Sequence, residues 1–159
     1  LLISSVESLH QKGFRNFTII VIGKINASTI PRHLQQYFIL LGRLGFEELY
    51  KQVQSCDFLL PLLDPENQAH RRYITTGTSG TFQLALGFHK PVILEQSFAQ
   101  INKLNDSNSI LYELNSNFHV AMERAIAMTP DSYYLLQKAV AETAKLIYIE
   151  SLQNLKNIL

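Results

Sequence analysis

Residues 37–63 read YFILLGRLGFEELYKQVQSCDFLLPLL and alternate between two kinds of pattern. The run YFILLG is short, apolar and closed by Gly42, which is typical of a strand buried on both faces of a sheet. Apolar residues then recur at helical spacing, at Phe46, Leu49, Val53 and Cys56. The run DFLLPLL indicates a further buried strand, with Pro61 marking an irregular or edge-like end. This order predicts a parallel sheet joined by crossover helices.

The same alternation continues outward in both directions. Apolar strand patterns stand at residues 17–23 (FTIIVIG), 91–95 (PVILE) and 109–114 (SILYEL). Helical patterns cover residues 1–11, 31–37, 81–89, 98–104 and 117–128, and a long last helix begins near Thr129-Pro130-Asp131. The polar stretch of residues 64–80 is expected to be a loop. We therefore expect one α/β domain, residues 1–159, with a Rossmann-like parallel sheet, helices on both faces and a long C-terminal helix.

The composition restricts the class of protein. The 159 residues are 47% hydrophobic and 17% charged, which suits a globular domain with its own core. A formal net charge of +1 without a basic stripe argues against a nucleic-acid-binding module. No apolar run approaches the ~20 residues of a membrane span. The single cysteine, Cys56, excludes an internal disulfide, fits a reducing, cytoplasmic setting and is expected to be a core residue rather than a reactive thiol.

Ligands of open α/β sheets bind outside the carboxyl ends of the strands. One segment expected there, ITTGTSGTFQLALGFHKPVIL at residues 74–94, gathers glycines and small hydroxyl residues directly before a helix. The first turn of a helix carries unpaired N–H groups and a partial positive charge, and so attracts phosphate. Gly77 and Gly80 would let the backbone approach an anion, and Thr78, Ser79 and Thr81 could donate hydrogen bonds. The alternative is a simple helix cap after a glycine turn.

Other kinds of site find little support in the sequence. The first strand is not followed by G-x-G-x-x-G, and the glycine-rich loop lacks the G-K-[ST] of a P-loop. Ser79 has no G-x-S-x-G context, so a hydrolase is not indicated. Histidines are scattered, at His10, His33, His70, His89 and His119, without the spacing of metal ligands on one helix face. No metal or cofactor is therefore predicted, and Asp64 and Glu66 are assigned to turn formation.

Two segments carry a resemblance to a known family. The order GRLGFEELYKQVQSCDFLLPLLDP (residues 42–65), then YITTGTSGTFQLALGFHKPVIL (residues 73–94), resembles the C-terminal domain of GT-B glycosyltransferases, group 1/4-like. The resemblance covers roughly residues 17–128. It implies two Rossmann-like domains with the active site between them, of which this chain is the half that holds the nucleotide-sugar donor. The family's last helix crosses back to the other domain, and residues 131–159 are long enough for that role.

The resemblance also implies site residues. Gly42, Arg43 and Leu44 would hold the nucleobase. Thr78, Ser79, Gly80 and Thr81, preceded by Gly77, would hold the diphosphate, with Gly23 and Lys24 on the same side of the sheet. Tyr73 and Thr76 would line the sugar pocket, although Tyr73 could equally pack the loop. Lys24 and Arg43, taken alone, would be assigned to the solvated surface.

Two departures from the family pattern matter. Many retaining members carry a glutamate pair around the glycine-rich helix, whereas no carboxylate lies between Glu66 and Glu95 here. The chain also starts in the helix that follows the family's first strand, so the Arg and Lys of the loop after that strand cannot be assessed. The general base of inverting members belongs to the other domain. No catalytic residue is therefore assigned.

The expected function is transfer of a sugar from a nucleoside diphosphate to an unidentified glycan or lipid-linked acceptor. The expected partners are the nucleoside-diphosphate sugar and the N-terminal GT-B domain, and peripheral contact with a membrane stays open. Two alternatives remain: a domain like that of the non-hydrolysing nucleotide-sugar epimerases, and a catalytically silent GT-B-like binding domain. The isolated chain is expected to be inactive in either enzyme, because half of the cleft lies in the other domain.

Overall fold

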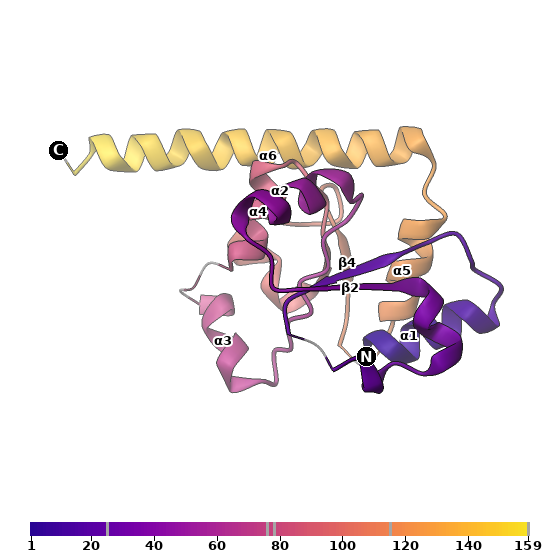
Figure 1. Ribbon diagram of the computed structural model, residues 1–159. Helices are drawn as coiled ribbons and strands as arrows, with labels where there is room; N and C mark the ends of the chain where they lie inside the picture. Colours follow the sequence, from indigo (N-terminus) through magenta and orange to yellow (C-terminus); the bar gives the residue numbers. More distant parts are fainter. Residues whose placement is uncertain (25, 76, 78, 115, 159) are drawn as a thin grey trace.

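The computed structural model describes residues 1–24, 26–75, 77, 79–114 and 116–158. The chain forms a mixed α/β structure (Figure 1). Its α-helices are α1 (Leu2–Gln11), α2 (Phe46–Ser55), α3 (Gln68–Thr75), α4 (Gly80–Gly87), α5 (Phe118–Ile126) and α6 (Pro130–Lys156). Its strands are β1 (Ile19–Ile22), β2 (Phe38–Gly42), β3 (Ile93–Glu95) and β4 (Ile110–Tyr112). Short 3-10 helices are η1 (Ala27–Thr29), η2 (Arg32–Tyr37), η3 (Gln96–Phe98) and η4 (Gln100–Asn102).

The strands form two parallel pairs in place of the single sheet that was predicted. β1 pairs with β2, and the register shifts between Val21 and Ile22. β3 pairs with β4, from Ile93 beside Ile110 to Glu95 beside Tyr112. An isolated parallel bridge joins Leu59 to Val92, at the open edge of the second pair. Every pairing made by the described residues is therefore parallel, as the sequence predicted, but the sheet is divided.

The predicted strand DFLLPLL is reduced to this bridge at Leu59. Pro61 has no N–H to donate, and Leu63 N–H turns back to the Pro61 carbonyl oxygen at 2.7 Å. Side chains around the bridge still alternate as in a strand. Phe58 and Leu60 pack against one hydrophobic cluster, and Leu59 packs against another. The segment therefore has strand-like packing, but among the described residues only Leu59 pairs with a neighbouring strand.

Two hydrophobic clusters lie on opposite faces of the β3–β4 pair. Ile93, Ile110 and Tyr112 belong to the first cluster, together with buried residues of α1 and α5 such as Leu9 and Phe118. Val92 and Leu94 belong to the second cluster, which includes Phe82 of α4 and Phe98 of η3. Because successive strand residues face opposite sides, this short pair is covered by helices on both faces, as predicted for the whole sheet.

The long last helix begins and runs as the sequence predicted. The Thr129 hydroxyl oxygen accepts the N–H of Ser132 at 3.3 Å, and Pro130 occupies the first helical turn. The Tyr133 hydroxyl donates to the Asp57 carbonyl oxygen at 2.8 Å, which ties this end to the body of the molecule. Figure 1 shows the other end of α6 extending beyond the remaining elements. The described helices include none with the length and apolar character that crossing a membrane requires.

Candidate functional site

Two glycines meet where β1 and β2 end. Gly23 N–H donates to the Gly42 carbonyl oxygen at 2.6 Å. Their φ angles are +118° and +67°, in the left-handed region that residues other than glycine rarely adopt. Lys24 and Arg43 follow directly and are exposed, and Leu44 is half-buried. The structure thus brings the predicted nucleobase loop and the predicted Gly23–Lys24 corner together at the carboxyl ends of two adjacent strands.

Ser79 is the N-cap of α4. Its hydroxyl oxygen accepts the N–H of Thr81 at 3.3 Å, and its carbonyl oxygen accepts those of Phe82 at 3.0 Å and Gln83 at 3.3 Å. The capping alternative that the sequence left open is therefore present in the structure. The Ser79 hydroxyl still has its own proton to donate. The adjacent Gly80 is exposed, and a Cβ built on it meets nothing within 4 Å.

Gly77 serves the end of α3 rather than an anion. Its N–H donates to the Arg72 carbonyl oxygen at 2.7 Å. A Cβ at this position would lie 3.1 Å from that oxygen and 3.3 Å from the Tyr73 ring. The Gly77 donor is therefore already used in this conformation, and contact of Gly77 with a phosphate stays a prediction. The predicted contacts of Thr76 and Thr78 fall outside the described residues.

Helix α3 occupies part of the stretch that was expected to be a loop. Asn67 begins it, with its side-chain oxygen accepting the Ala69 N–H at 3.0 Å. The Asp64 N–H donates to His70 Nδ1 at 3.0 Å, and Asp64 Oδ1 accepts the Glu66 N–H at 2.8 Å. These bonds give the His70 ring and the Asp64 carboxylate local roles, as the turn assignment predicted for Asp64, whereas Glu66 takes part only through its backbone N–H.

Tyr73 has a packing role that does not depend on a ligand. Its half-buried ring packs against the second hydrophobic cluster. The Arg72 guanidinium lies 4.7 Å from the ring centroid and donates to the Tyr73 hydroxyl at 2.6 Å. Contact of Tyr73 with a sugar stays a prediction.

A buried polar pair that the sequence did not predict lies at the carboxyl ends of β3 and β4. Glu95 ends β3 and is 3% exposed, with Oε2 accepting the Ser97 N–H at 2.9 Å. Its neighbour in register, Tyr112, is 1% exposed, and its hydroxyl makes no hydrogen bond with any described residue. Burial, followed by the charges of Glu95 and Asp64, raises the pKa of Tyr112 to about 12. A lone acidic residue closing a buried apolar run is the sequence signal that could have identified Glu95.

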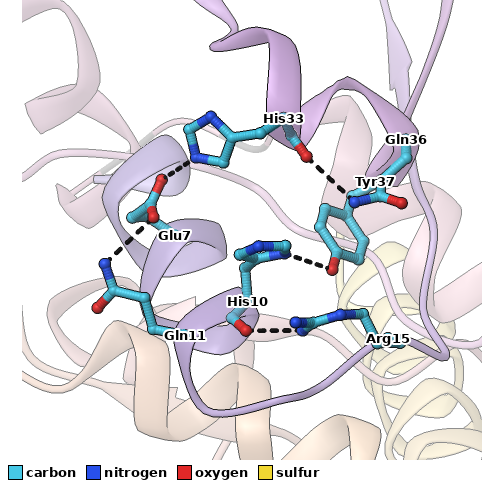
Figure 2. A network of polar contacts seen from close by, with 7 residues as sticks. All are labelled: Glu7, His10, Gln11, Arg15, His33, Gln36 and Tyr37. Atoms are coloured by element: carbon cyan, nitrogen blue, oxygen red, sulfur yellow. Dashed lines mark hydrogen bonds and ion pairs between the residues drawn. The ribbon is translucent and has the colours of Figure 1, made fainter.

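His10 and His33 are not scattered in space, although the sequence analysis treated them so. Their ring centroids lie 5.7 Å apart, between α1 and η2 (Figure 2). His10 Nδ1 lies 2.8 Å from the Tyr37 hydroxyl, which donates to the Phe14 carbonyl oxygen at 3.3 Å. His33 Nε2 lies 2.6 Å from Glu7 Oε2.

This histidine network is separate from the candidate site. Tyr37 immediately precedes β2, so the network lies at the amino end of that strand, away from Gly42. No group of three or more His, Cys, Asp or Glu residues could hold a metal ion in the described part of the chain.

Cys56 is half-buried, and its thiol donates to the Val53 carbonyl oxygen at 3.2 Å. Burial raises the pKa of the Cys56 thiol. The thiolate is therefore disfavoured at neutral pH, which agrees with a packing role rather than a nucleophilic one.

No protein-family model matches this chain, and no curated protein matches it. A function must therefore be argued from the residues themselves, their geometry and the family resemblance of their motifs.

Proposed function

We propose that this chain is the donor-binding domain of a GT-B glycosyltransferase, with a Rossmann-like arrangement of its strands. The observation that carries the proposal is the Gly23–Gly42 pair. Two adjacent parallel strands end there in left-handed glycines, and the exposed cations Lys24 and Arg43 follow. Ligands of α/β sheets bind at such carboxyl edges, and the two positive charges suit a nucleoside diphosphate.

The proposed roles follow from the motif order. Gly42, Arg43 and Leu44 contact the nucleobase. The Ser79 hydroxyl proton, the Gly80 backbone and Thr81 contact the diphosphate, and Lys24 adds a cation. When the glycosidic bond breaks, charge grows on the leaving diphosphate, and donors fixed in place stabilise it. The other GT-B domain supplies the acceptor side. We place the enzyme in the cytoplasm or at its membrane surface, a setting that fits the single cysteine.

Gly80→Val tests the proposal at the helix start. A Cβ at Gly80 meets no protein atom within 4 Å, so the variant should fold and block only a ligand. Gly87→Val is the matched control, because Gly87 is exposed at the other end of α4 with equal space around it. Titration calorimetry would use UDP, GDP and ADP beside the corresponding nucleosides. We expect the wild-type chain and Gly87→Val to bind one diphosphate, and Gly80→Val to lose it.

Equal diphosphate affinity in Gly80→Val and Gly87→Val would contradict the proposed site. The absence of diphosphate binding by the wild-type chain would contradict the proposed function as well.

A specific observation favours a second candidate, a silent GT-B-like binding domain. The Gly77 N–H and the Ser79 hydroxyl both serve helix ends, as they would in a domain that had lost its ligand. Absence of nucleoside diphosphate binding by the wild-type chain would support this second candidate.

A further inference from the structure

His70 is held in the first turn of α3 by a hydrogen bond that fixes its tautomer. The Asp64 N–H donates to His70 Nδ1 at 3.0 Å. A backbone N–H can only donate, so Nδ1 carries no proton and the one proton of the ring lies on Nε2. His70 is therefore a neutral side chain with a single donor, the Nε2–H group, whose direction is set by the bond at the other nitrogen.

The Nε2–H group is left free for a ligand. Within the described part of the chain, the His70 ring makes one hydrogen bond, the bond at Nδ1. Nε2 is not sealed from water either, because the Tyr112 hydroxyl is the one side-chain polar atom of the described residues that is both buried and without a partner. Since His70 is half-buried, its donor stands at the surface in a partly enclosed place.

The inner face of α3 carries His70 on the side that packs toward α4. His70, Tyr73 and Ile74 are half-buried at helical spacing, whereas residues 69, 71, 72 and 75 are exposed. Tyr73 and Ile74 pack against the second hydrophobic cluster, which contains Phe82 in the first turn of α4. His70 therefore shares a face with Tyr73, which the family resemblance assigns to the sugar pocket.

Carboxylates stand near the His70 ring. Asp64, whose N–H the ring accepts, uses Oδ1 to accept the Glu66 N–H at 2.8 Å, and its second oxygen remains an acceptor. Burial is the main cause that raises the pKa of Tyr112, and the charges of Glu95 and Asp64 follow, so both carboxylates lie near that hydroxyl. The strand ends beside His70 are therefore acidic.

The nearest cations in the chain follow His70 on the exposed side of α3. Arg71 Nε donates to the Pro65 carbonyl oxygen at 3.3 Å, and Arg72 donates to the Tyr73 hydroxyl at 2.6 Å. The inner face thus offers a neutral donor beside carboxylate acceptors. Phosphate is anionic and suits this combination poorly, whereas a sugar hydroxyl accepts from an N–H and donates to a carboxylate.

We infer that His70 binds the sugar ring of the nucleotide-sugar donor, with Nε2–H donating to one sugar hydroxyl and an Asp64 carboxylate oxygen accepting from another. The inference rests on the proposed function, because it assigns a sugar-binding residue within the proposed site. Since the Nε2–H group has a fixed direction, it selects sugars that place a hydroxyl oxygen in that direction.

Two amide substitutions separate the hydrogen bond that His70 accepts from the one that it donates. His70→Asn places an amide oxygen where Nδ1 stands, which keeps an acceptor for the Asp64 N–H and removes the donor at Nε2. His70→Gln extends an amide N–H group toward the Nε2 position and loses the acceptor near Asp64. His89→Asn is the control, because His89 is exposed beyond the other end of α4 and asparagine tolerates its φ of +51°.

Titration calorimetry would use UDP-glucose, GDP-mannose and ADP-glucose, each beside its nucleoside diphosphate. We expect His70→Asn to weaken nucleotide-sugar binding by about fivefold to tenfold and to leave diphosphate binding within about twofold of wild type. His70→Gln should keep nucleotide-sugar binding within about twofold of wild type but melt about 2–4 °C lower, because it loses the bond from Asp64. His89→Asn should match wild type in both affinities.

The tautomer is measured on the wild-type chain, so this part of the test stands even if a variant does not fold. Nitrogen-15 NMR distinguishes the protonated from the unprotonated nitrogen of each imidazole ring, and the signals that either His70 variant lacks identify His70. We expect the Nε2–H form in the free protein. The Nε2 signal should shift when the nucleotide sugar is added and stay in place when the nucleoside diphosphate is added.

Three results would overturn the inference and leave the proposed function standing. They are an Nδ1–H tautomer in the free protein, equal nucleotide-sugar affinity of wild type and His70→Asn, and an equal loss of diphosphate and nucleotide-sugar affinity in His70→Asn, which would mean that His70 contacts phosphate. Absence of diphosphate binding by the wild-type chain would overturn the proposed function, and the inference with it.

Discussion

Tyr37 and Tyr112 are buried tyrosines that differ in what their hydroxyls contact. Tyr37 is 2% exposed and contacts His10 and the Phe14 carbonyl oxygen, whereas the Tyr112 hydroxyl has no partner among the described residues. A buried hydroxyl without a partner keeps its desolvation cost and gains nothing in return. The two residues therefore form a natural pair for comparison.

Tyr112→Phe should leave the free energy of unfolding unchanged or raise it by about 1 kcal/mol, because it removes an unpaired polar atom. Tyr37→Phe should lower it by about 1 kcal/mol, because it removes a paired one. Urea denaturation of both variants beside the wild type measures the difference. A loss of stability in Tyr112→Phe comparable with that in Tyr37→Phe would mean that the Tyr112 hydroxyl has a partner in solution.

Ser79→Ala separates the two roles that the sequence gives to this hydroxyl. Loss of the cap should lower the free energy of unfolding by about 1 kcal/mol. If the hydroxyl also donates to a diphosphate, nucleoside diphosphate binding should weaken about tenfold to a hundredfold, while nucleoside binding changes much less. Thermal melts and calorimetric titrations measure the two effects on the same protein. A lower melting temperature with unchanged diphosphate affinity would make Ser79 a cap alone.

The Glu7–His33 contact predicts how stability depends on acid. The hydrogen bond from His33 is the main cause that lowers the pKa of Glu7 from its ordinary value of 4.5. Because the pKa of Glu7 is lower in the folded state, the ionised Glu7 carboxylate stabilises the folded state above pH 4.5. This stabilisation is lost as the pH falls through the lowered pKa. The difference in melting temperature between wild type and Glu7→Gln should therefore shrink as the pH falls below 4.5.

Glu142→Gln is the control for this acid series, since it removes the same charge from an exposed position on α6. A Glu7→Gln difference that stays constant over this range, or that the control reproduces, would show that the His33 contact is not its source.

At the scale of elements, the sequence predicted the helices with a clear apolar pattern and missed α3, which is mostly polar. Thr129 and Pro130 marked the start of α6, and its position is confirmed. Helix α3 was missed because its start, Asn67, lies in a polar run that also reads as a turn, and because its face is mostly polar. The strand predicted at residues 57–63 is reduced to a bridge at Leu59, because apolar composition indicates burial but does not supply a hydrogen-bonding neighbour.

Gly77→Ala should disturb the connection between α3 and α4. The added Cβ would press on the Arg72 carbonyl oxygen and the Tyr73 ring, both at distances tighter than ordinary contact. We expect a loss of about 1 kcal/mol in the free energy of unfolding, whereas Gly87→Ala, with open space around it, should raise stability by about 0.5–1 kcal/mol through helix propensity. Chemical denaturation measures both. Equal effects of the two variants would show that the α3 end relaxes without cost.

At the scale of the molecule, the sequence predicted the α/β class of the fold but not the division of its strands into two pairs. The alternation of patterns predicted parallel pairing, and each observed pair is parallel. It could not show that the sheet divides between β1 and residues 58–60, because periodicity identifies strands and not their neighbours. The candidate site was predictable in part. Gly23 and Gly42 meet at the ends of their strands as expected, but no sequence pattern shows that the Gly77 N–H donates to the Arg72 carbonyl oxygen of α3.

The proposed function predicts that the 159-residue chain binds a nucleoside diphosphate sugar without turning it over. The reason is that the general base is expected in the other GT-B domain and that no catalytic residue is assigned here. Incubation with radiolabelled UDP-, GDP- and ADP-sugars should show binding by filter assay and no labelled product. Steady transfer or hydrolysis by the purified chain would contradict the division of roles between two domains.

The first hydrophobic cluster has a consequence for synthesis of the chain on the ribosome. It joins α1 to α5, and Lys12 forms an ion pair with Glu123, 111 positions later. Leu34 and Tyr37 of the same cluster are translated early, but Phe118 and Met122 follow Val6 and Leu9 only after roughly 6–22 s at ~5–20 residues per second. During that interval the nascent chain exposes the part of the cluster that α5 covers. Folding of this half is consequently late in translation, and the chain should require chaperone protection while it is being made.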